Sequence, residues 1–128
     1  MRAFVTRWFA RFARKERIED DLLCDAIRRA EQGSVDADLG GGVIKQRIAR
    51  AGGGRSGGYR SLIAFHSGKH TVFMYGFAKN QRDNVSTTEL EDLRKLARRL
   101  LALNEDQVAT ALREGELKEI DCNGQQQH

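Results

Sequence analysis

The amino-acid sequence predicts an α+β domain in which helices pack on one face of a small antiparallel β-sheet. Three observations lead to this fold class. Two helical patterns lie near the N-terminus, three β-capable segments fill the middle of the chain, and a leucine stripe at helical spacing follows them. With a short strand at the start, the predicted element order is β-α-α-β-β-β-α. The chain of 128 residues suits one domain over residues 1–115, followed by a polar, flexible tail over residues 116–128.

Short apolar and aromatic patterns define the N-terminal elements. Residues 2–6 are β-capable and are predicted to form an edge strand. Trp8, Phe9 and Phe12 follow at helical spacing, and we expect all three rings to pack into the core. A second helix is predicted over residues 19–32, because acidic residues lie at its start and basic residues lie near its end.

The loop that we expect over residues 34–42 contains two carboxylates. Asp36 and Asp38 have the spacing of a paired-carboxylate site, but both residues also suit the ends of turns. We favour the turn interpretation, since they lie at the border of a long segment without acidic residues.

Alternating and apolar segments predict three consecutive strands. Residues 43–50 alternate, so that Lys45 and Arg47 lie on the same face of the first of these strands. The other two strands are predicted over residues 59–66 and 71–78. Their short connections indicate an antiparallel meander.

Helical signals return after the predicted meander. Ser86 and Glu89 have the spacing of a capping box, and leucines at helical spacing continue to Leu103. A second, shorter helix is predicted over residues 105–113.

The middle of the chain is strongly basic. No Asp or Glu lies between Asp38 and Asp83, although the whole chain carries 22 basic and 18 acidic residues. The segment contains eight basic residues: Lys45, Arg47, Arg50, Arg55, Arg60, Lys69, Lys79 and Arg82. A basic centre within an acidic frame indicates a surface that meets an anion such as a polyphosphate backbone, the alternative being a chance cluster of solvated charges. Its glycine-rich part, residues 51–58, lacks the P-loop pattern and is predicted to be a flexible hairpin connection.

Cysteine usage and hydropathy limit the class of protein. Cys24 and Cys122 are far apart in the sequence, and no CxxC or Cys/His cluster is present. We therefore predict reduced thiols, no zinc or other metal site, no cofactor and a cytoplasmic location. The chain has no apolar run long enough to span a membrane, and its N-terminus lacks the apolar region of a secretory signal.

Six sequence blocks occur in an order that resembles the RelE/HigB-like group of bacterial toxins. They are TRWFARFA, DADLGGG, GGVIKQRIAR, GRSGGYR, FMYGFAKNQRDN and ELEDLRKLARRLL, within residues 3–103. The resemblance implies a small antiparallel sheet flanked by helices and the toxin role in a type II toxin–antitoxin system. Many toxins of this group enter the ribosomal A site and cleave messenger RNA. The implied partners are a cognate antitoxin, often with a helix-turn-helix domain, the ribosome and mRNA.

The same resemblance implies which basic residues perform the chemistry. RNA cleavage by internal transfer needs a proton acceptor for the 2′-hydroxyl group, charge stabilisation at the phosphate and help for the departing oxygen. The residues that match the catalytic positions are Lys45, Arg47, Arg60 and Lys79, with Lys45 as the favoured proton acceptor. The residues that we expect to contact RNA are Arg50, Arg55, Asn80 and Arg82.

The chain departs from the family pattern after the last predicted strand. Several members carry a catalytic Tyr or His there, whereas this chain has Ser86. This departure leaves the general acid and base unassigned. His66, His70 and Tyr75 are candidates on chemistry alone, but packing in the sheet or a solvated turn explains them equally.

Two other functions remain open from the sequence. The related ParE branch shares the fold and poisons DNA gyrase without cleaving RNA. A degenerate toxin would only bind its antitoxin or nucleic acid. In each case we expect an acidic or amphipathic antitoxin segment to cover the basic surface, with a second docking place on the predicted edge strand over residues 2–6.

Overall fold

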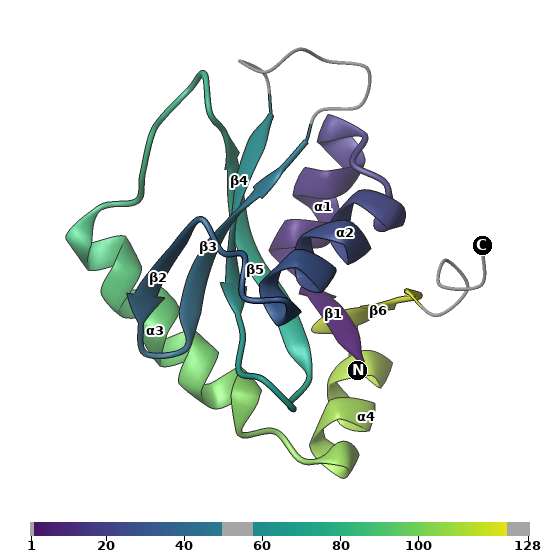
Figure 1. The fold of residues 1–128 in the computed structure, drawn as a ribbon. Coiled ribbons are helices and arrows are strands. Elements are labelled where there is room, and N and C mark those ends of the chain that lie inside the picture. Colours follow the sequence, from purple (N-terminus) through teal and green to yellow (C-terminus); the bar gives the residue numbers. More distant parts are fainter. Residues whose placement is uncertain (1, 50–57, 123–128) are drawn as a thin grey trace.

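The computed structural model describes residues 2–49 and 58–122 and confirms the α+β class (Figure 1). Its helices are α1 (Arg7–Glu16), α2 (Asp20–Glu31), α3 (Thr87–Leu101) and α4 (Glu105–Arg113). Its strands are β1 (Ala3–Thr6), β2 (Ala37–Gly40), β3 (Val43–Ile48), β4 (Tyr59–Ala64), β5 (Thr71–Ala78) and β6 (Leu117–Ile120). Most of the predicted glycine-rich connection, with Arg50 and Arg55, lies outside the described residues, as do residues 123–128.

The strands form one mixed sheet in the order β2-β3-β4-β5-β1-β6. Neighbours are antiparallel except β1 and β5, which run parallel with Ala3 opposite Thr71, so the expectation of a purely antiparallel sheet is wrong at this pair. The prediction that residues 2–6 form an edge strand is also wrong. β1 lies between β5 and β6, and its apolar residues Ala3, Phe4 and Val5 are buried, as is typical of an interior strand.

Two short strands that the sequence did not predict form the edges of the sheet. β2 pairs with β3, so part of the expected loop over residues 34–42 is a strand. β6 pairs with β1 and buries Leu117 and Ile120, so the predicted polar tail is wrong over these residues. The short helix predicted over residues 105–113 is confirmed as α4, which leads into β6.

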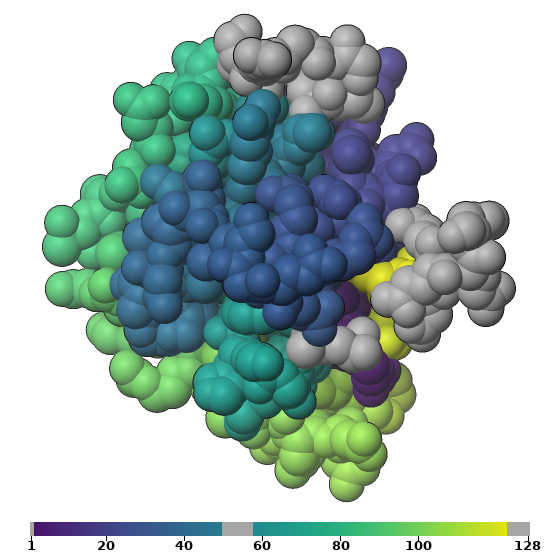
Figure 2. Space-filling model, in the orientation of Figure 1, coloured from purple at the N-terminus to yellow at the C-terminus, as the bar shows by residue number. Residues whose placement is uncertain are grey.

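Helices cover both faces of the sheet rather than one. α1 and α2 pack on the first face, and Figure 2 shows that side, where the purple and blue side chains of these helices lie over the sheet. On the second face, α3 packs against β3, β4 and β5, and α4 packs against β6. The second face is therefore only partly open, although Arg47 on it remains exposed. None of the described helices is long and apolar enough to cross a membrane.

Polar caps fix the start of the helices that flank the sheet. The Thr6 hydroxyl accepts a hydrogen bond from the Phe9 backbone N–H at the start of α1. Ser86 and Glu89 form the predicted capping box at the start of α3. Each cap satisfies backbone N–H groups that lack an intrahelical partner, so these helices begin at defined residues.

The aromatic residues of α1 do not all enter the core. Phe9 is fully buried and Phe12 is half-buried, but Trp8 is 39% exposed, so the prediction that all three rings are buried is wrong for Trp8. Phe9 and Phe12 lie over Gly76 in β5. A Cβ atom at Gly76 would lie 2.7 Å from Phe12 Cε2, so only glycine allows the helix to approach the strand this closely.

We expect Gly76→Ala to lower the free energy of unfolding by about 1–3 kcal/mol, the usual cost of overpacking a core. The added methyl group must displace the Phe12 ring, which the surrounding rings hold in place. Urea unfolding measures the effect. In a Phe12→Leu background the same substitution should cost less, and equal costs in both backgrounds would contradict the steric explanation.

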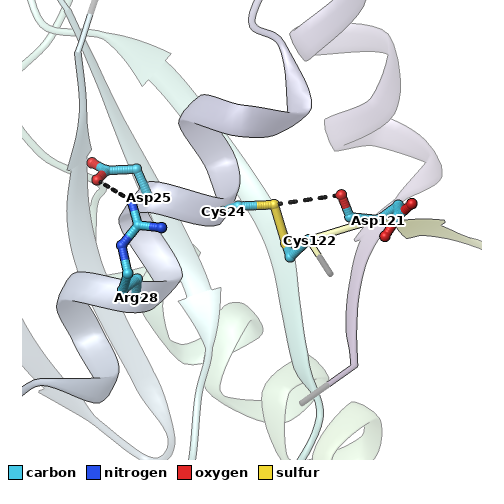
Figure 3. The surroundings of a disulfide bond; sticks show 5 residues. All are labelled: Cys24, Asp25, Arg28, Asp121 and Cys122. Carbon is cyan, nitrogen blue, oxygen red and sulfur yellow. Dashed lines mark hydrogen bonds and ion pairs between the residues drawn. A yellow bond between two sulfur atoms is a disulfide. The ribbon is translucent and has the colours of Figure 1, made fainter. Parts of the chain in front are cut away.

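A disulfide bond joins the two cysteines (Figure 3). Cys24 is buried in α2, and Cys122 follows β6 by two residues, with 5.5 Å between their Cα atoms. The Cys24 sulfur also lies 3.9 Å from the carbonyl oxygen of Asp121. The prediction of two reduced thiols is therefore wrong, because the pairing of β6 with β1 brings the end of the chain beside α2.

Candidate functional site

Strand register brings two predicted site arginines face to face. Arg47 in β3 lies directly opposite Arg60 in β4, and Arg60 lies opposite Phe77 in β5. Directly opposed residues point to the same face of a sheet, so these three side chains form one row across three strands. Two like charges in one such row repel each other unless a counter-charge is present.

A second row lies next to the first on the same face. It runs from Lys45 in β3 through Leu62 in β4 to Tyr75 in β5. Lys45 and Tyr75 are half-buried, and Leu62 is fully buried. Among the described residues, the Lys45 ammonium group makes no ion pair or hydrogen bond. We call the surface formed by Lys45, Arg47, Arg60 and Arg82 the basic face.

Arg60 is held by a carboxylate that the sequence analysis placed in a turn. Its Nε atom lies 3.1 Å from Asp36 Oδ2, and its side chain is only 14% exposed. Asp36 directly precedes β2, so this contact depends on the pairing of β2 with β3, which local sequence patterns did not predict. Asp38 lies within β2 rather than in a loop, and its carboxylate accepts a hydrogen bond from the Gly40 backbone N–H ahead of the turn to β3.

Arg82 completes the basic face from the segment that follows β5. Its guanidinium group lies 5.5 Å from the centre of the Phe77 ring, and its Nη1 atom lies 3.4 Å from the Tyr75 hydroxyl group. It also forms two hydrogen bonds to Glu89, the shorter at 2.6 Å. These contacts link the segment after β5, the start of α3 and the sheet.

Glu89 has two roles at this point of the fold. Its carboxylate accepts hydrogen bonds from Arg82 and from the Ser86 backbone N–H. These two contacts, with Arg82 first, lower the pKa of Glu89 from 4.5 to about 2, and the same pair raises the pKa of Arg82.

We expect the Glu89 charge to make stability depend on pH in the acid range. Because the folded-state pKa is depressed, the stabilisation is present above about pH 4.5 and is lost as the pH falls to about 2. Urea midpoints measured across this range test the effect. Glu89→Gln retains a capping side chain but no charge, so its midpoint should fall less steeply. Parallel curves for the two proteins would contradict this assignment.

The structure does not bring the two candidate histidines to the basic face. His66 lies in the connection after β4, where its Nδ1 atom contacts the Ser67 carbonyl oxygen at 2.9 Å. His70 directly precedes β5, and its Nε2 atom contacts the Leu100 carbonyl oxygen at 2.6 Å. Both positions are at the opposite end of these strands from Arg60. Of the three acid/base candidates, only Tyr75 lies beside the basic face.

The other predicted site residues lie outside the basic face or outside the described residues. Lys79 and Asn80 are exposed in the turn after β5, next to the end of the strand that carries Phe77. Arg50 and Arg55 lie outside the described residues. Within residues 2–49 and 58–122, no group of three or more His, Cys, Asp or Glu residues has the arrangement of a metal site. The basic face thus presents cationic groups and the Tyr75 hydroxyl group, with the carboxylates of Asp36 and Glu89 paired to Arg60 and Arg82.

One protein family matches this chain. The model of the family described as "RelE toxin of RelE / RelB toxin-antitoxin system" matches residues 1–120. No curated protein and no solved structure matches the chain. The match covers every described helix and strand. The chain therefore belongs to the RelE toxin family and is a toxin of a toxin–antitoxin system.

Proposed function

We propose that this toxin is a ribosome-dependent endoribonuclease, an mRNA interferase that inhibits translation by cleaving mRNA. The observation that carries this proposal is the row in which Arg47 lies directly opposite Arg60, with Lys45 in the adjacent row. Asp36 balances part of this positive charge in the free protein, and a bound phosphate would add further counter-charge. The family match supports the same class of activity.

The basic face suits the charge changes of RNA cleavage by internal transfer. In our proposal Lys45, in its neutral amine form, accepts the proton of the attacking 2′-hydroxyl group and becomes an ammonium group. Arg47 and Arg60 stabilise the extra negative charge on the phosphate in the transition state, and Lys79 contacts it from the end of β5. Cations fixed by the protein need no rearrangement as charge develops, which makes such groups effective. We propose no metal in this reaction.

Other predicted residues would hold the RNA away from the reacting phosphate. We propose this role for Arg50, Arg55, Asn80 and Arg82. Arg82 is fixed over Phe77 and hydrogen-bonded to Glu89, which suits a positioning contact better than a mobile catalytic group. The donor for the departing oxygen stays unassigned, with Tyr75 as the candidate beside the face.

The proposed partners follow from the same surface. We propose that a cognate antitoxin, of the helix-turn-helix type, covers the basic face with an acidic or amphipathic segment. Strand addition, if it contributes, uses the sheet edges β2 or β6, because β1 is paired on both sides. Because the proposed target is the translating ribosome, the proposed location is the cytoplasm.

A purified translation system tests the proposed activity against a gyrase poison. We expect the wild-type protein to stop protein synthesis and to leave DNA supercoiling by gyrase unchanged. Addition of the cognate antitoxin should restore synthesis. Unimpaired translation together with blocked supercoiling would contradict the nuclease proposal and favour the gyrase alternative.

A further inference from the structure

Trp8 is an exposed aromatic residue with a defined setting. Among the described residues, only Trp8 and Val35 are large hydrophobic residues in the exposed class, and Trp8 is the single tryptophan of the chain. It lies in the first turn of α1 and borders an open groove of about 380 Å³. A single exposed aromatic residue is common on protein surfaces and is not by itself a site. Trp8 is a candidate because its ring contacts Tyr75, which lies beside the basic face.

Neighbouring rings hold the Trp8 side chain in place. The Trp8 and Tyr75 ring centres are 4.4 Å apart at 35°, and the Trp8 and Phe12 ring centres are 5.5 Å apart at 17°. Phe12 in turn contacts Phe9 and Tyr59. The Trp8–Phe12 pair is nearly parallel and the Trp8–Tyr75 pair is tilted. Both contacts restrict the Trp8 ring, so little conformational entropy is lost when a flat ligand binds.

The aromatic surface is continuous with the basic face. Tyr75, which contacts Trp8, ends the row that begins with Lys45, and its hydroxyl group lies 3.4 Å from Arg82 Nη1. Lys45 and Tyr75 are two strands apart, or about 10 Å at the usual strand spacing. A phosphate on the basic face and a base on Trp8 can therefore belong to the same short stretch of RNA.

We propose that Trp8, supported by Tyr75 and Phe12, is a stacking site for one unpaired base of the RNA whose phosphates bind the basic face. The inference rests on the proposed function and adds a base-binding subsite to it. Sites for single-stranded RNA usually combine basic residues along the phosphate backbone with aromatic side chains on which bases stack. Lys45 lies in the same row as Tyr75, and among the described residues its ammonium group makes no ion pair, so it can contact a phosphate next to the stacked base.

Binding of a fluorescently labelled single-stranded RNA oligomer at low ionic strength tests the proposal. We expect Trp8→Leu to weaken binding by about 5- to 150-fold, the range for losing one base–aromatic stack. Trp8→Phe should recover part of this loss. Binding should also quench the fluorescence of the single tryptophan. Circular dichroism of both variants confirms that they are folded.

Abasic RNA separates stacking from a general loss of affinity. A series of oligomers is made, each lacking the base at a different position. For the wild type, one member of the series should bind more weakly than the others. For Trp8→Leu, all members should bind with the same affinity. Arg47→Ala should weaken binding of intact and abasic oligomers by the same factor, since it removes a phosphate contact.

The possible failures are distinguishable. If Trp8→Leu binds RNA like the wild type while Arg47→Ala binds weakly, the stacking site is wrong and the proposed function stands. If the wild type binds no RNA oligomer, the stacking site is wrong, whereas the proposed function is decided separately by mRNA cleavage on ribosomes. If Trp8→Leu loses only binding to the cognate antitoxin, Trp8 is a protein anchor and the stacking proposal is overturned.

Discussion

Arg60→Ala is expected to lower the rate of mRNA cleavage by about 10²- to 10³-fold, as for loss of one preorganised group that stabilises transition-state charge. Arg60 lies in the middle strand of the Arg47–Arg60–Phe77 row, so it has a fixed position relative to a bound phosphate. The rate is measured with a defined mRNA on purified ribosomes. Arg60→Lys should recover only part of the rate, because an ammonium group cannot reproduce the planar guanidinium contacts.

Two matched variants control for charge and for the Arg60 ion pair. Arg113→Ala removes an exposed arginine of α4 and should cleave at the wild-type rate. Asp36→Asn removes the carboxylate that lies 3.1 Å from Arg60 but keeps the arginine, and it should retain cleavage. Equal losses in Arg60→Ala and Arg113→Ala would show that net charge matters rather than the basic face.

Loss of the Cys24–Cys122 disulfide is expected to lower the free energy of unfolding by about 2–5 kcal/mol, the usual range for a native disulfide. The bond joins residues that are 98 apart in the sequence. In the chain-entropy description, a disulfide stabilises the folded state more when it closes a longer loop. Urea unfolding of the oxidised protein, with and without a thiol reductant, measures the difference in an unchanged sequence.

The double variant Cys24→Ser/Cys122→Ser serves as the control. It should unfold near the midpoint of the reduced wild type and should not respond to reductant. The effect should be largest at β6, whose end the bond ties to α2, so amide exchange there should rise on reduction. Identical midpoints with and without reductant for the wild type would contradict a stabilising disulfide.

Local patterns in the sequence were enough to predict the strongly periodic parts of the fold. Helix α4 has the predicted bounds, and the Ser86–Glu89 capping box is present, because both depend on residues close together in the chain. The short strands β2 and β6 were missed for the opposite reason. Each has four residues and is formed through pairing with a strand elsewhere in the chain, so its own sequence carries little signal.

In the candidate site too, features set by local sequence were predicted and features set by distant strand pairing were not. Strand alternation correctly predicted that Lys45 and Arg47 share a face, and register then placed Arg60 beside them. The Asp36 contact depends on β2, and the disulfide depends on β6, so neither was visible without these strands. Exposure of Trp8 was missed because an aromatic residue at helical spacing normally indicates the core.

The proposal that this toxin cleaves mRNA is tested most directly by mapping new 5′ ends in a single mRNA by primer extension. The purified wild-type protein is added with and without ribosomes, and Arg60→Ala is added with ribosomes. We predict new ends only for the wild type with ribosomes present. A folded wild-type protein that produces no new ends under any of these conditions would contradict the nuclease proposal.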